Sequence, residues 1–240
     1  MKVIITEDYR ELSEKAFEIM KDVLKNKCAV LGLATGSTPL GLYEMMVEDH
    51  RQNGTSYRKV RTINLDEYVG LEKDNEQSYC RFMRENLFDK IDIDPANTNI
   101  ENGMAPDLKK ECERYNALLS RFPRDVQLLG IGANGHIAFN EPGTPFDSET
   151  HVVDLTENTI EMNSRFFKSK DAVPRRALTM GIKNITDAKK VLILACGASK
   201  AEAVFRLVRG EITEQLPASI LQKHPDCVLI ADRDAASLIR

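Results

Sequence analysis

The sequence predicts an α/β protein with a mostly parallel sheet covered by helices on both faces, a three-layer α/β/α arrangement. The first observation is a set of short apolar runs without polar alternation, typical of strands buried on both faces. The second is that these runs alternate along the 240-residue chain with amphipathic segments of helical length. The third is that no Pro- or Ser-rich linker and no internal repeat divides the chain. We therefore expect a single domain over residues 1–240.

Six apolar runs are the expected strands. They span residues 2–6, 29–34, 60–65, 126–132, 189–197 and 227–232. The segments between them carry apolar residues at the spacing of amphipathic helices. The expected helices span residues 12–24, 39–52, 76–91, 105–122 and 199–210.

The composition is that of an ordinary globular protein, with 42% apolar residues, 29% charged residues and a net charge of −4. This charge argues against nucleic acid or an anionic membrane as the main partner. No apolar run approaches the roughly 18 residues of a membrane span, and the N-terminus is too polar for a signal peptide. We expect a cytoplasmic protein whose five scattered cysteines are reduced.

Four of the expected strands end in polar loops, where α/β proteins carry their sites. In the first loop, Pro39 opens a helix and is preceded by Thr35, Gly36, Ser37 and Thr38. Free N–H groups and the positive end of a helix favour an anion site here, with Thr38 able to cap the helix. A plain capped turn explains the loop equally well, because neither a Walker motif nor a G-x-G-x-x-G fingerprint is present.

The second loop, N-L-D-E-Y-V-G at 64–70, has two adjacent carboxylates at a strand end. Neighbouring side chains of an extended chain point in opposite directions, so Asp66 and Glu67 are not expected to share a proton. We expect one to face the cleft as a candidate general base and the other to make a structural contact. A helix cap or a surface pair is the alternative.

The third loop, G-I-G-A-N-G-H-I-A-F-N-E-P at 130–142, carries His136 directly after the turn signal Asn134-Gly135. A lone histidine is more often structural, but one that leaves a tight bend can reach a ligand. Asn134 and Glu141 are both able to bond an imidazole nitrogen and fix its tautomer. This combination favours an oriented base.

The fourth loop has Lys200 in the first turn of a helix, where a cation opposes the helix dipole by about 0.3–1 kcal/mol unless an anion binds. Arg165, followed by two phenylalanines, is the other candidate cation. A solvated lysine and an arginine in ordinary packing are the alternatives. Scattered histidines and cysteines predict no metal site, and the G-x-S-x-G elbow of serine hydrolases is absent.

Five stretches together resemble the glucosamine-6-phosphate deaminase (isomerising) family, in its short bacterial form. They are G-L-A-T-G-S-T-P-L-G-L-Y, N-L-D-E-Y-V-G-L, G-I-G-A-N-G-H-I-A-F-N-E-P-G-T, N-S-R-F-F and G-A-S-K-A. They follow the family's order and spacing over nearly the whole chain. The run G-H-I-A-F-N-E-P is highly specific, whereas the G-S-T-P loop alone is a weak signal.

The resemblance implies a Rossmann-like fold and a metal-free reaction without a cofactor, in which glucosamine 6-phosphate and water give fructose 6-phosphate and ammonia. It implies that His136 assists ring opening, with Glu141 as the motif's acid, and that Asp66 takes the proton beside the amino-bearing carbon. It also implies a lid within about 144–178 and a phosphate cradle made of the loop 35–38, Arg165 and Lys200.

Two departures from the family pattern bear on regulation and pH dependence. Many relatives have Asp where this chain has Asn134, and Asp would favour the imidazolium form, so we expect His136 to stay neutral to lower pH here. The stretch S-E-T-H-V-V-D-L-T offers His151 and Val153 but no Arg or Lys for an effector phosphate, and little chain follows the last strand. We expect hyperbolic kinetics, no activation by N-acetylglucosamine 6-phosphate, and a monomer or small homo-oligomer.

Two other functions fit the same fold. A 6-phosphogluconolactonase-like hydrolase shares the G-x-x-G-H segment, but we expect it to lack the N-E-P ending and the D-E-Y strand end. A non-catalytic sugar-phosphate sensor would carry a DNA-binding element and lose the catalytic residues. The intact motifs favour the deaminase.

Overall fold

The central sheet of the protein is entirely parallel. The computed structural model describes residues 1–164, 167, 169 and 172–240. Its sheet has the order β1-β10-β9-β6-β2-β3-β5, which confirms the expected α/β class. The seven strands are β1 (Lys2–Thr6), β2 (Val30–Leu33), β3 (Arg61–Asn64), β5 (Thr98–Asn99), β6 (Val126–Gly130), β9 (Val191–Ala195) and β10 (Cys227–Asp232).

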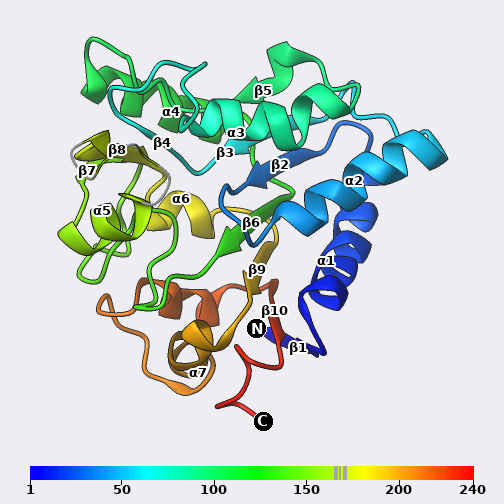
Figure 1. The fold of residues 1–240 in the computed structure, drawn as a ribbon, viewed down its shortest axis with the longest axis vertical. Helices are drawn as coiled ribbons and strands as arrows, with labels where there is room; N and C mark the ends of the chain where they lie inside the picture. The colour runs from blue at the N-terminus through cyan, green and yellow to red at the C-terminus, as the bar shows by residue number, and fades with distance from the viewer. Residues whose placement is uncertain (165–166, 168, 170–171) are drawn as a thin grey trace.

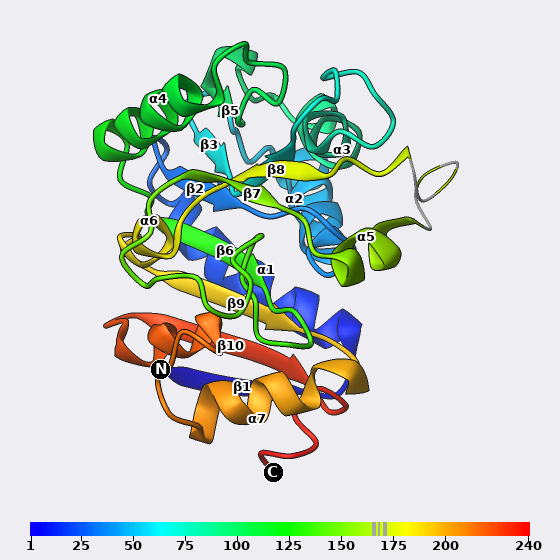
Figure 2. The same cartoon turned by 90° about the vertical axis from the view of Figure 1, so that its left-hand side faces the viewer.

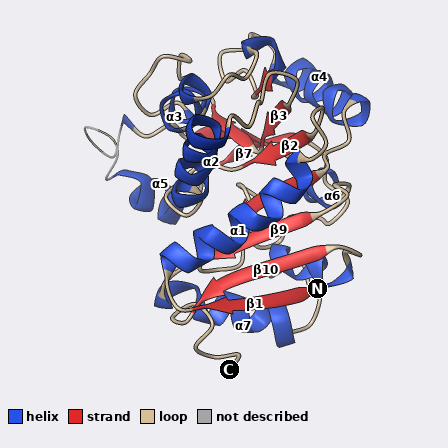
Figure 3. Cartoon of the chain, turned by 90° about the vertical axis from the view of Figure 1, so that its right-hand side faces the viewer, coloured by secondary structure: helices blue, strands red, loops and turns tan. Residues whose placement is uncertain are grey.

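Helices cover both faces of this sheet. Figures 1 and 3 show α1 (Tyr9–Leu24) and α2 (Leu40–Asn53) on one face, and Figure 2 shows α7 (Ala201–Arg209) on the other. The remaining helices are α3 (Tyr79–Asn86), α4 (Leu108–Arg121), α5 (Glu157–Ser164) and α6 (Ile182–Thr186). The 3₁₀ segments given for the described residues are η1 (Phe88–Lys90), η2 (Pro95–Asn97), η4 (Ala198–Lys200) and the longer η5 (Pro217–Lys223). Over the described ranges, none of the helices has the length and apolarity to cross a membrane.

The first helix illustrates how the sequence builds these layers. The Asp8 side chain accepts the N–H of Glu11 and so caps α1. The apolar residues of α1 recur at helical spacing, and its fully or nearly fully buried ones are Leu12, Ala16, Met20 and Leu24. Burying each of the larger side chains contributes about 1.5–3 kcal/mol, which fixes this face of α1 against the sheet.

A second, antiparallel sheet was not predicted. It has the order β4-β8-β7, with β4 (Asp66–Tyr68), β7 (His151–Asp154) and β8 (Arg176–Thr179). Strands of three or four residues are too short to show a period, so this part of the sequence is only weakly patterned. A small apolar cluster packs beneath this sheet and α5: Tyr68, Phe139, Leu155, Ile160, Val173 and Ala177.

Two expected helices are shorter than predicted. The segment 76–91 divides into α3 and η1 because Leu87 leaves helical geometry, with φ −140° and ψ −60°. The segment 105–122 becomes helical only after Asp107, whose side chain accepts the N–H of Lys110 and caps α4.

The strand order places the expected site loops together. From β2 the chain moves outward to β3 and β5, and it then returns to β6 on the opposite side of β2. The loops after β2 and β6 therefore lie at the topological switch point, where open α/β sheets bind ligands. Because all seven strands are parallel, the loops after β3 and β9 lie at the same end of the sheet, where the carboxyl ends of the strands are.

The close approach of residues 101–103 to β4 gives a stability prediction. A Cβ added at Gly103 would lie 1.9 Å from the carbonyl oxygen of Tyr68, a backbone atom that cannot rotate away. We expect Gly103→Ala to lower the free energy of unfolding by about 1–3 kcal/mol in urea titrations. Gly130→Ala is the control, since its Cβ would meet no atom within 4 Å. Equal stability of the two variants would contradict the prediction.

Candidate active site

The loop after β2 presents backbone donors to solvent. Gly36 has φ +91°, a left-handed conformation that favours glycine, and it turns the chain after Thr35. Over the described part of the chain, the N–H groups of Gly36, Ser37 and Thr38 donate to no protein acceptor. Three consecutive free N–H groups next to a helix start suit an anion.

The predicted cap on α2 is wrong. Pro39 is the N-cap, with φ −81° and ψ −6°, and Thr38 does not cap the helix. The Tyr9 hydroxyl of α1 takes that role, because it accepts the N–H of Gly41 at 2.8 Å and donates to the Ser37 carbonyl at 3.1 Å. A residue far back in the chain therefore fixes the loop and leaves its other N–H groups available.

Lys200 lies at the same edge of the sheet, after β9. It is half-buried at the N-cap position of α7, and within the described residues no carboxylate comes within ion-pair distance of its ammonium. Burial lowers the pKa of Lys200. Since β6 alone separates β9 from β2, the two loops lie roughly 10 Å apart. Arg165, the other predicted cation, lies outside the described residues.

The loop after β6 is a tight turn built around glycine. Gly135 has φ +85° and donates its N–H to the Gly132 carbonyl at 2.9 Å, which confirms the predicted Asn-Gly turn. The imidazole of His136 lies directly over Gly132, because a Cβ at Gly132 would be 2.3 Å from the ring. The turn thus holds the ring beside the strand end.

Glu141 faces this imidazole and has two further partners. Its Oε1 lies 3.7 Å from Nδ1 of His136, which is an ion-pair distance longer than a hydrogen bond. Asn134 donates to Oε2 at 2.7 Å, and Thr159 of α5 donates to Oε1 at 2.9 Å. Burial alone would raise the pKa of Glu141, but these donors and the nearby histidine together lower it to about 2.

The predicted contact between Asn134 and the imidazole is wrong. The Asn134 side chain accepts the backbone N–H of His136 at 3.2 Å and donates to Glu141. The short turn brings the amide back onto its own backbone, so it cannot also reach the ring. Asn134 therefore orients the carboxylate that faces the histidine.

The two carboxylates after β3 have different environments. Glu67 is 3% exposed and accepts the Ser78 hydroxyl together with the N–H groups of Tyr68, Tyr79 and Cys80. Asp66 is 7% exposed, and over the described ranges no donor reaches its carboxylate. Burial and the charge of Glu67 raise the pKa of Asp66 to about 8. The prediction that one of the pair is structural is confirmed for Glu67.

Strand β8 connects Asp66 with the loop of His136. Asp66 is paired with Thr179 in the antiparallel ladder, and the Thr179 hydroxyl accepts the N–H of Phe139 at 3.2 Å. Buried Asn140 donates to the carbonyl of Met180 at 2.9 Å. The structure thus brings together the segments that carry Asp66, His136 and Glu141.

Glu101 is a buried carboxyl that sequence reasoning missed. It follows the edge strand β5, is 2% exposed, and neither of its oxygens has a hydrogen-bond partner within the described residues. Burial, and then the charge of Asp66, raise the pKa of Glu101 well above its usual range. A single Glu in the run I-E-N-G gives no signal of burial, and only the pairing of β5 with β3 places it there.

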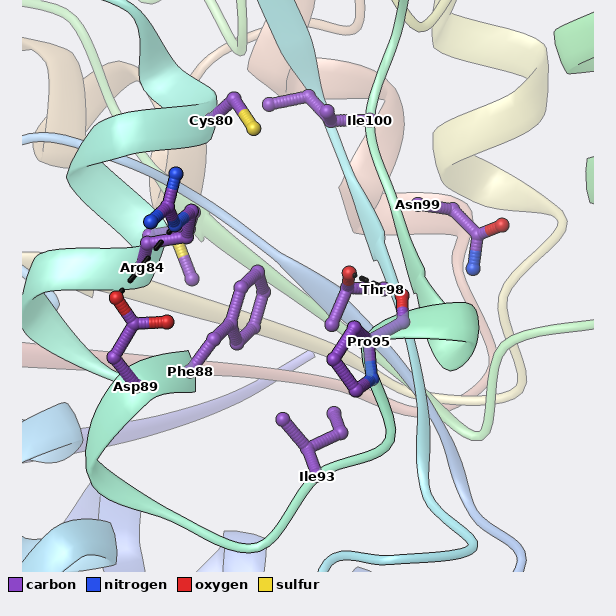
Figure 4. Close-up of a pocket in the computed structure, with 10 residues that line it drawn as sticks. Cys80, Arg84, Phe88, Asp89, Ile93, Pro95, Thr98, Asn99 and Ile100 are labelled. Atoms are coloured by element: carbon purple, nitrogen blue, oxygen red, sulfur yellow. Dashed lines mark hydrogen bonds and ion pairs between the residues drawn. The ribbon is translucent and has the colours of Figure 1, made fainter. Parts of the chain in front are cut away.

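An apolar pocket between α3, η1 and β5 is separate from these residues (Figure 4). Its side chains include Met83, Phe88 and Ile93, and the Arg84–Asp89 ion pair at 3.6 Å lies on one side. None of the predicted site residues lines it. Its apolar lining does not suit a charged sugar.

The fold and the site define a class: a parallel α/β protein whose strand-end loops combine a turn rich in free N–H groups, a buried carboxyl and a histidine–carboxylate pair. Residues 6–229 match the family described as glucosamine-6-phosphate isomerases/6-phosphogluconolactonase, and the chain belongs to this family.

Similar proteins include named deaminases that match along their full length. The chain is 52% identical to the glucosamine-6-phosphate deaminase of Clostridium novyi (strain NT) over 239 residues, 99% of each protein. It is 50% identical to the protein of that name from Thermoanaerobacter pseudethanolicus, covering 100% of this chain and 95% of the relative. A solved monomeric glucosamine-6-phosphate deaminase superposes with a TM-score of 0.96 at 48% identity, covering 99% of this chain and 100% of that one. The 6-phosphogluconolactonase of Trypanosoma cruzi, at 20% identity and a TM-score of 0.80, shares the fold alone.

The buried Glu101 gives a pH-dependent stability prediction. An acid whose pKa is raised by folding stabilises the protein below its unfolded pKa of about 4.3, and this contribution is lost as the pH rises through the folded pKa. We expect the free energy of unfolding to fall less with rising pH in Glu101→Gln than in the wild type. The stability of the variant relative to the wild type should therefore increase steadily between pH 5 and pH 8.

Urea titrations between pH 5 and pH 8 measure this difference. The matched control is Glu44→Gln, since Glu44 is exposed on α2. Parallel stability curves for Glu101→Gln and the wild type would show the prediction to be wrong.

Proposed function

We propose that the protein is a glucosamine-6-phosphate deaminase, which converts glucosamine 6-phosphate and water to fructose 6-phosphate and ammonia. One observation carries the proposal: β8 joins the loop of the His136–Glu141 pair to the strand end that bears Asp66. Asp66 is buried and, among the described residues, has no hydrogen-bond donor. The high identity to relatives of that name along the full chain supports it.

The anionic end of the substrate belongs at the loops after β2 and β9. Two features match a phosphate in charge and in donor count. They are the N–H groups of Gly36, Ser37 and Thr38, which have no acceptor among the described residues, and the half-buried ammonium of Lys200. By family resemblance, Thr35 and Arg165 complete this cradle. Binding energy from the phosphate positions the reacting carbons some bonds away.

Ring opening is the task of His136. The imidazole takes the proton of the anomeric hydroxyl and returns one to the ring oxygen. Its other nitrogen faces Glu141, whose lowered pKa keeps the carboxylate charged and able to stabilise the imidazolium. Acid–base catalysis of this kind contributes about 10²–10⁴-fold to the rate.

Isomerisation and deamination are the task of Asp66. The carboxylate removes the proton from the amino-bearing carbon beside the new aldehyde, while the substrate's own ammonium group gives a proton to the aldehyde oxygen, and the product is an enolamine. It returns that proton to the former anomeric carbon, which leaves an iminium at the neighbouring carbon. Water adds there, the carbon–nitrogen bond breaks, and ammonia leaves with the proton that water supplies. A pKa of about 8 makes Asp66 a stronger base than an exposed aspartate.

Three further properties are part of the proposal. A lid within about 144–178 covers the sugar and excludes water while the enolamine exists. The protein acts in the cytoplasm as a monomer or a small homo-oligomer, as the likeness to a monomeric deaminase supports. It follows hyperbolic kinetics without an acetylated effector.

The first activity prediction concerns Asp66. Removing the base should lower ammonia release from glucosamine 6-phosphate by roughly 10²–10⁴-fold in Asp66→Asn, with no metal added to either enzyme. Asp22→Asn, at an exposed position of α1, is the control. Lactone hydrolysis without ammonia would instead identify a 6-phosphogluconolactonase, and binding without turnover a sugar-phosphate sensor.

The second activity prediction concerns Lys200. A hydrogen bond to a charged group contributes about 1.5–3 kcal/mol, so Lys200→Gln should raise KM by roughly 10–100-fold with a smaller change in kcat. Inhibition by inorganic phosphate should weaken in parallel. The exposed Lys223→Gln serves as control. An unchanged KM in Lys200→Gln would remove this lysine from the phosphate site.

A further inference from the structure

The first turn of α5 reaches the histidine–carboxylate pair through one hydroxyl. Thr159 donates to Oε1 of Glu141 at 2.9 Å. The Thr156 hydroxyl in turn donates to Oγ1 of Thr159 at 3.0 Å, so the proton of Thr159 is directed toward the carboxylate. A helix 18 residues further along the chain thus contacts the loop after β6.

The oxygen that Thr159 holds is the one that faces the imidazole. Nδ1 of His136 is buried, has no hydrogen-bond partner within the described residues, and lies 3.7 Å from this same Oε1. The other oxygen of Glu141 is fixed by Asn134 at 2.7 Å. The carboxylate is therefore held between two donors, one from its own loop and one from α5.

We infer that Thr159 is a positioning residue, whose hydroxyl sets the separation between the Glu141 carboxylate and the His136 imidazole. Without that hydroxyl, Oε1 loses its competing donor and can close on Nδ1. The electrostatic effect of the Glu141 carboxylate on His136 therefore depends on α5 as well as on the loop that carries His136.

The packing of α5 does not require this hydroxyl. Ile160, which is 1% exposed, packs the helix onto the small apolar cluster with Leu155 and Val173. The Thr156 hydroxyl accepts the N–H of Thr159 and supports the first turn. The contact with Glu141 is an additional feature of the Thr159 side chain.

Other charged groups around the pair have partners of their own. Glu157 of α5 pairs with Arg175 at 3.1 Å, and Glu214 accepts the N–H of Phe146 at 3.0 Å. Asp66 belongs to another strand-end loop, which Thr179 joins to that of His136, and the substitution leaves it unchanged. A change in the titration of His136 on substitution of Thr159 therefore reports on Glu141.

The test is the imidazole titration of His136, followed by NMR on the full-length protein, with His136→Gln used to assign its signals. We expect the midpoint in Thr159→Val to rise by about 1 pH unit, because the freed carboxylate approaches and stabilises the imidazolium. Thr159→Ser should titrate like the wild type, since serine keeps the donor. Ser164→Ala, which removes a hydroxyl at the other end of α5, should also leave the midpoint unchanged.

Activity provides a second measurement, which rests on the proposed function. The acidic limb of kcat/KM for ammonia release should move upward in Thr159→Val and not in Thr159→Ser, with kcat lowered several-fold and KM little changed. Equal titrations of His136 in the valine variant and the wild type would overturn the inference, as would an equal shift in Ser164→Ala. Absence of ammonia release by the wild type would overturn the proposed function alone, because the NMR titration does not depend on substrate.

Discussion

The candidate site depends on the end of β8, where a few buried polar contacts join two strand-end loops. The Met180 N–H donates to the Leu65 carbonyl at 2.7 Å next to Asp66, and the Thr179 hydroxyl accepts the N–H of Phe139 in the loop of His136. Each such bond contributes only about 1 kcal/mol to stability. Their importance is geometric, because a displacement of about 1 Å between two catalytic groups can cost two orders of magnitude in rate.

Unsatisfied polar groups occur on β3, directly before Asp66, and in the segment after β5. The Thr62 hydroxyl, the whole Asn64 amide and both oxygens of Glu101 are buried without hydrogen-bond partners within the described residues. Each such group costs about 1–3 kcal/mol, which the apolar core must offset. Natural sequences break the rules of foldability mainly at functional sites. A buried environment poor in protein donors also makes Asp66 basic, so the same feature that weakens the fold strengthens the base.

Sequence reasoning recovered the parts of the molecule that have a long or specific signal. The run that forms β9 is apolar without interruption, and those that form β6 and β10 contain one polar residue each. The loop of His136 carries a motif whose turn the structure confirms. The small sheet was missed because β4, β7 and β8 have only three or four residues each. Arg165 was predicted as a phosphate ligand and lies outside the described residues.

Glu101 and Thr159 show why the remaining site residues could not be predicted. Neither stands in a recognisable pattern, and each gains its environment only from long-range pairing. The register of β5 against β3 carries Glu101 toward Asp66, and the packing of Ile160 brings Thr159 to Glu141. Local sequence specifies strands and turns, whereas these contacts join residues of different segments and depend on the completed fold.

The contacts of Asn134 also indicate a role different from the predicted one. An amide two residues before the histidine was expected to orient the ring, but its donor faces Glu141 at 2.7 Å. Aspartate in this place would set two carboxylates against each other, and like charges at that distance oppose each other's ionisation. The extra charge would therefore act first on Glu141 and only through it on His136. Within the described residues, Asn134 and Thr159 hold the carboxylate as neutral donors, and Thr159 binds the oxygen that lies 3.7 Å from the imidazole.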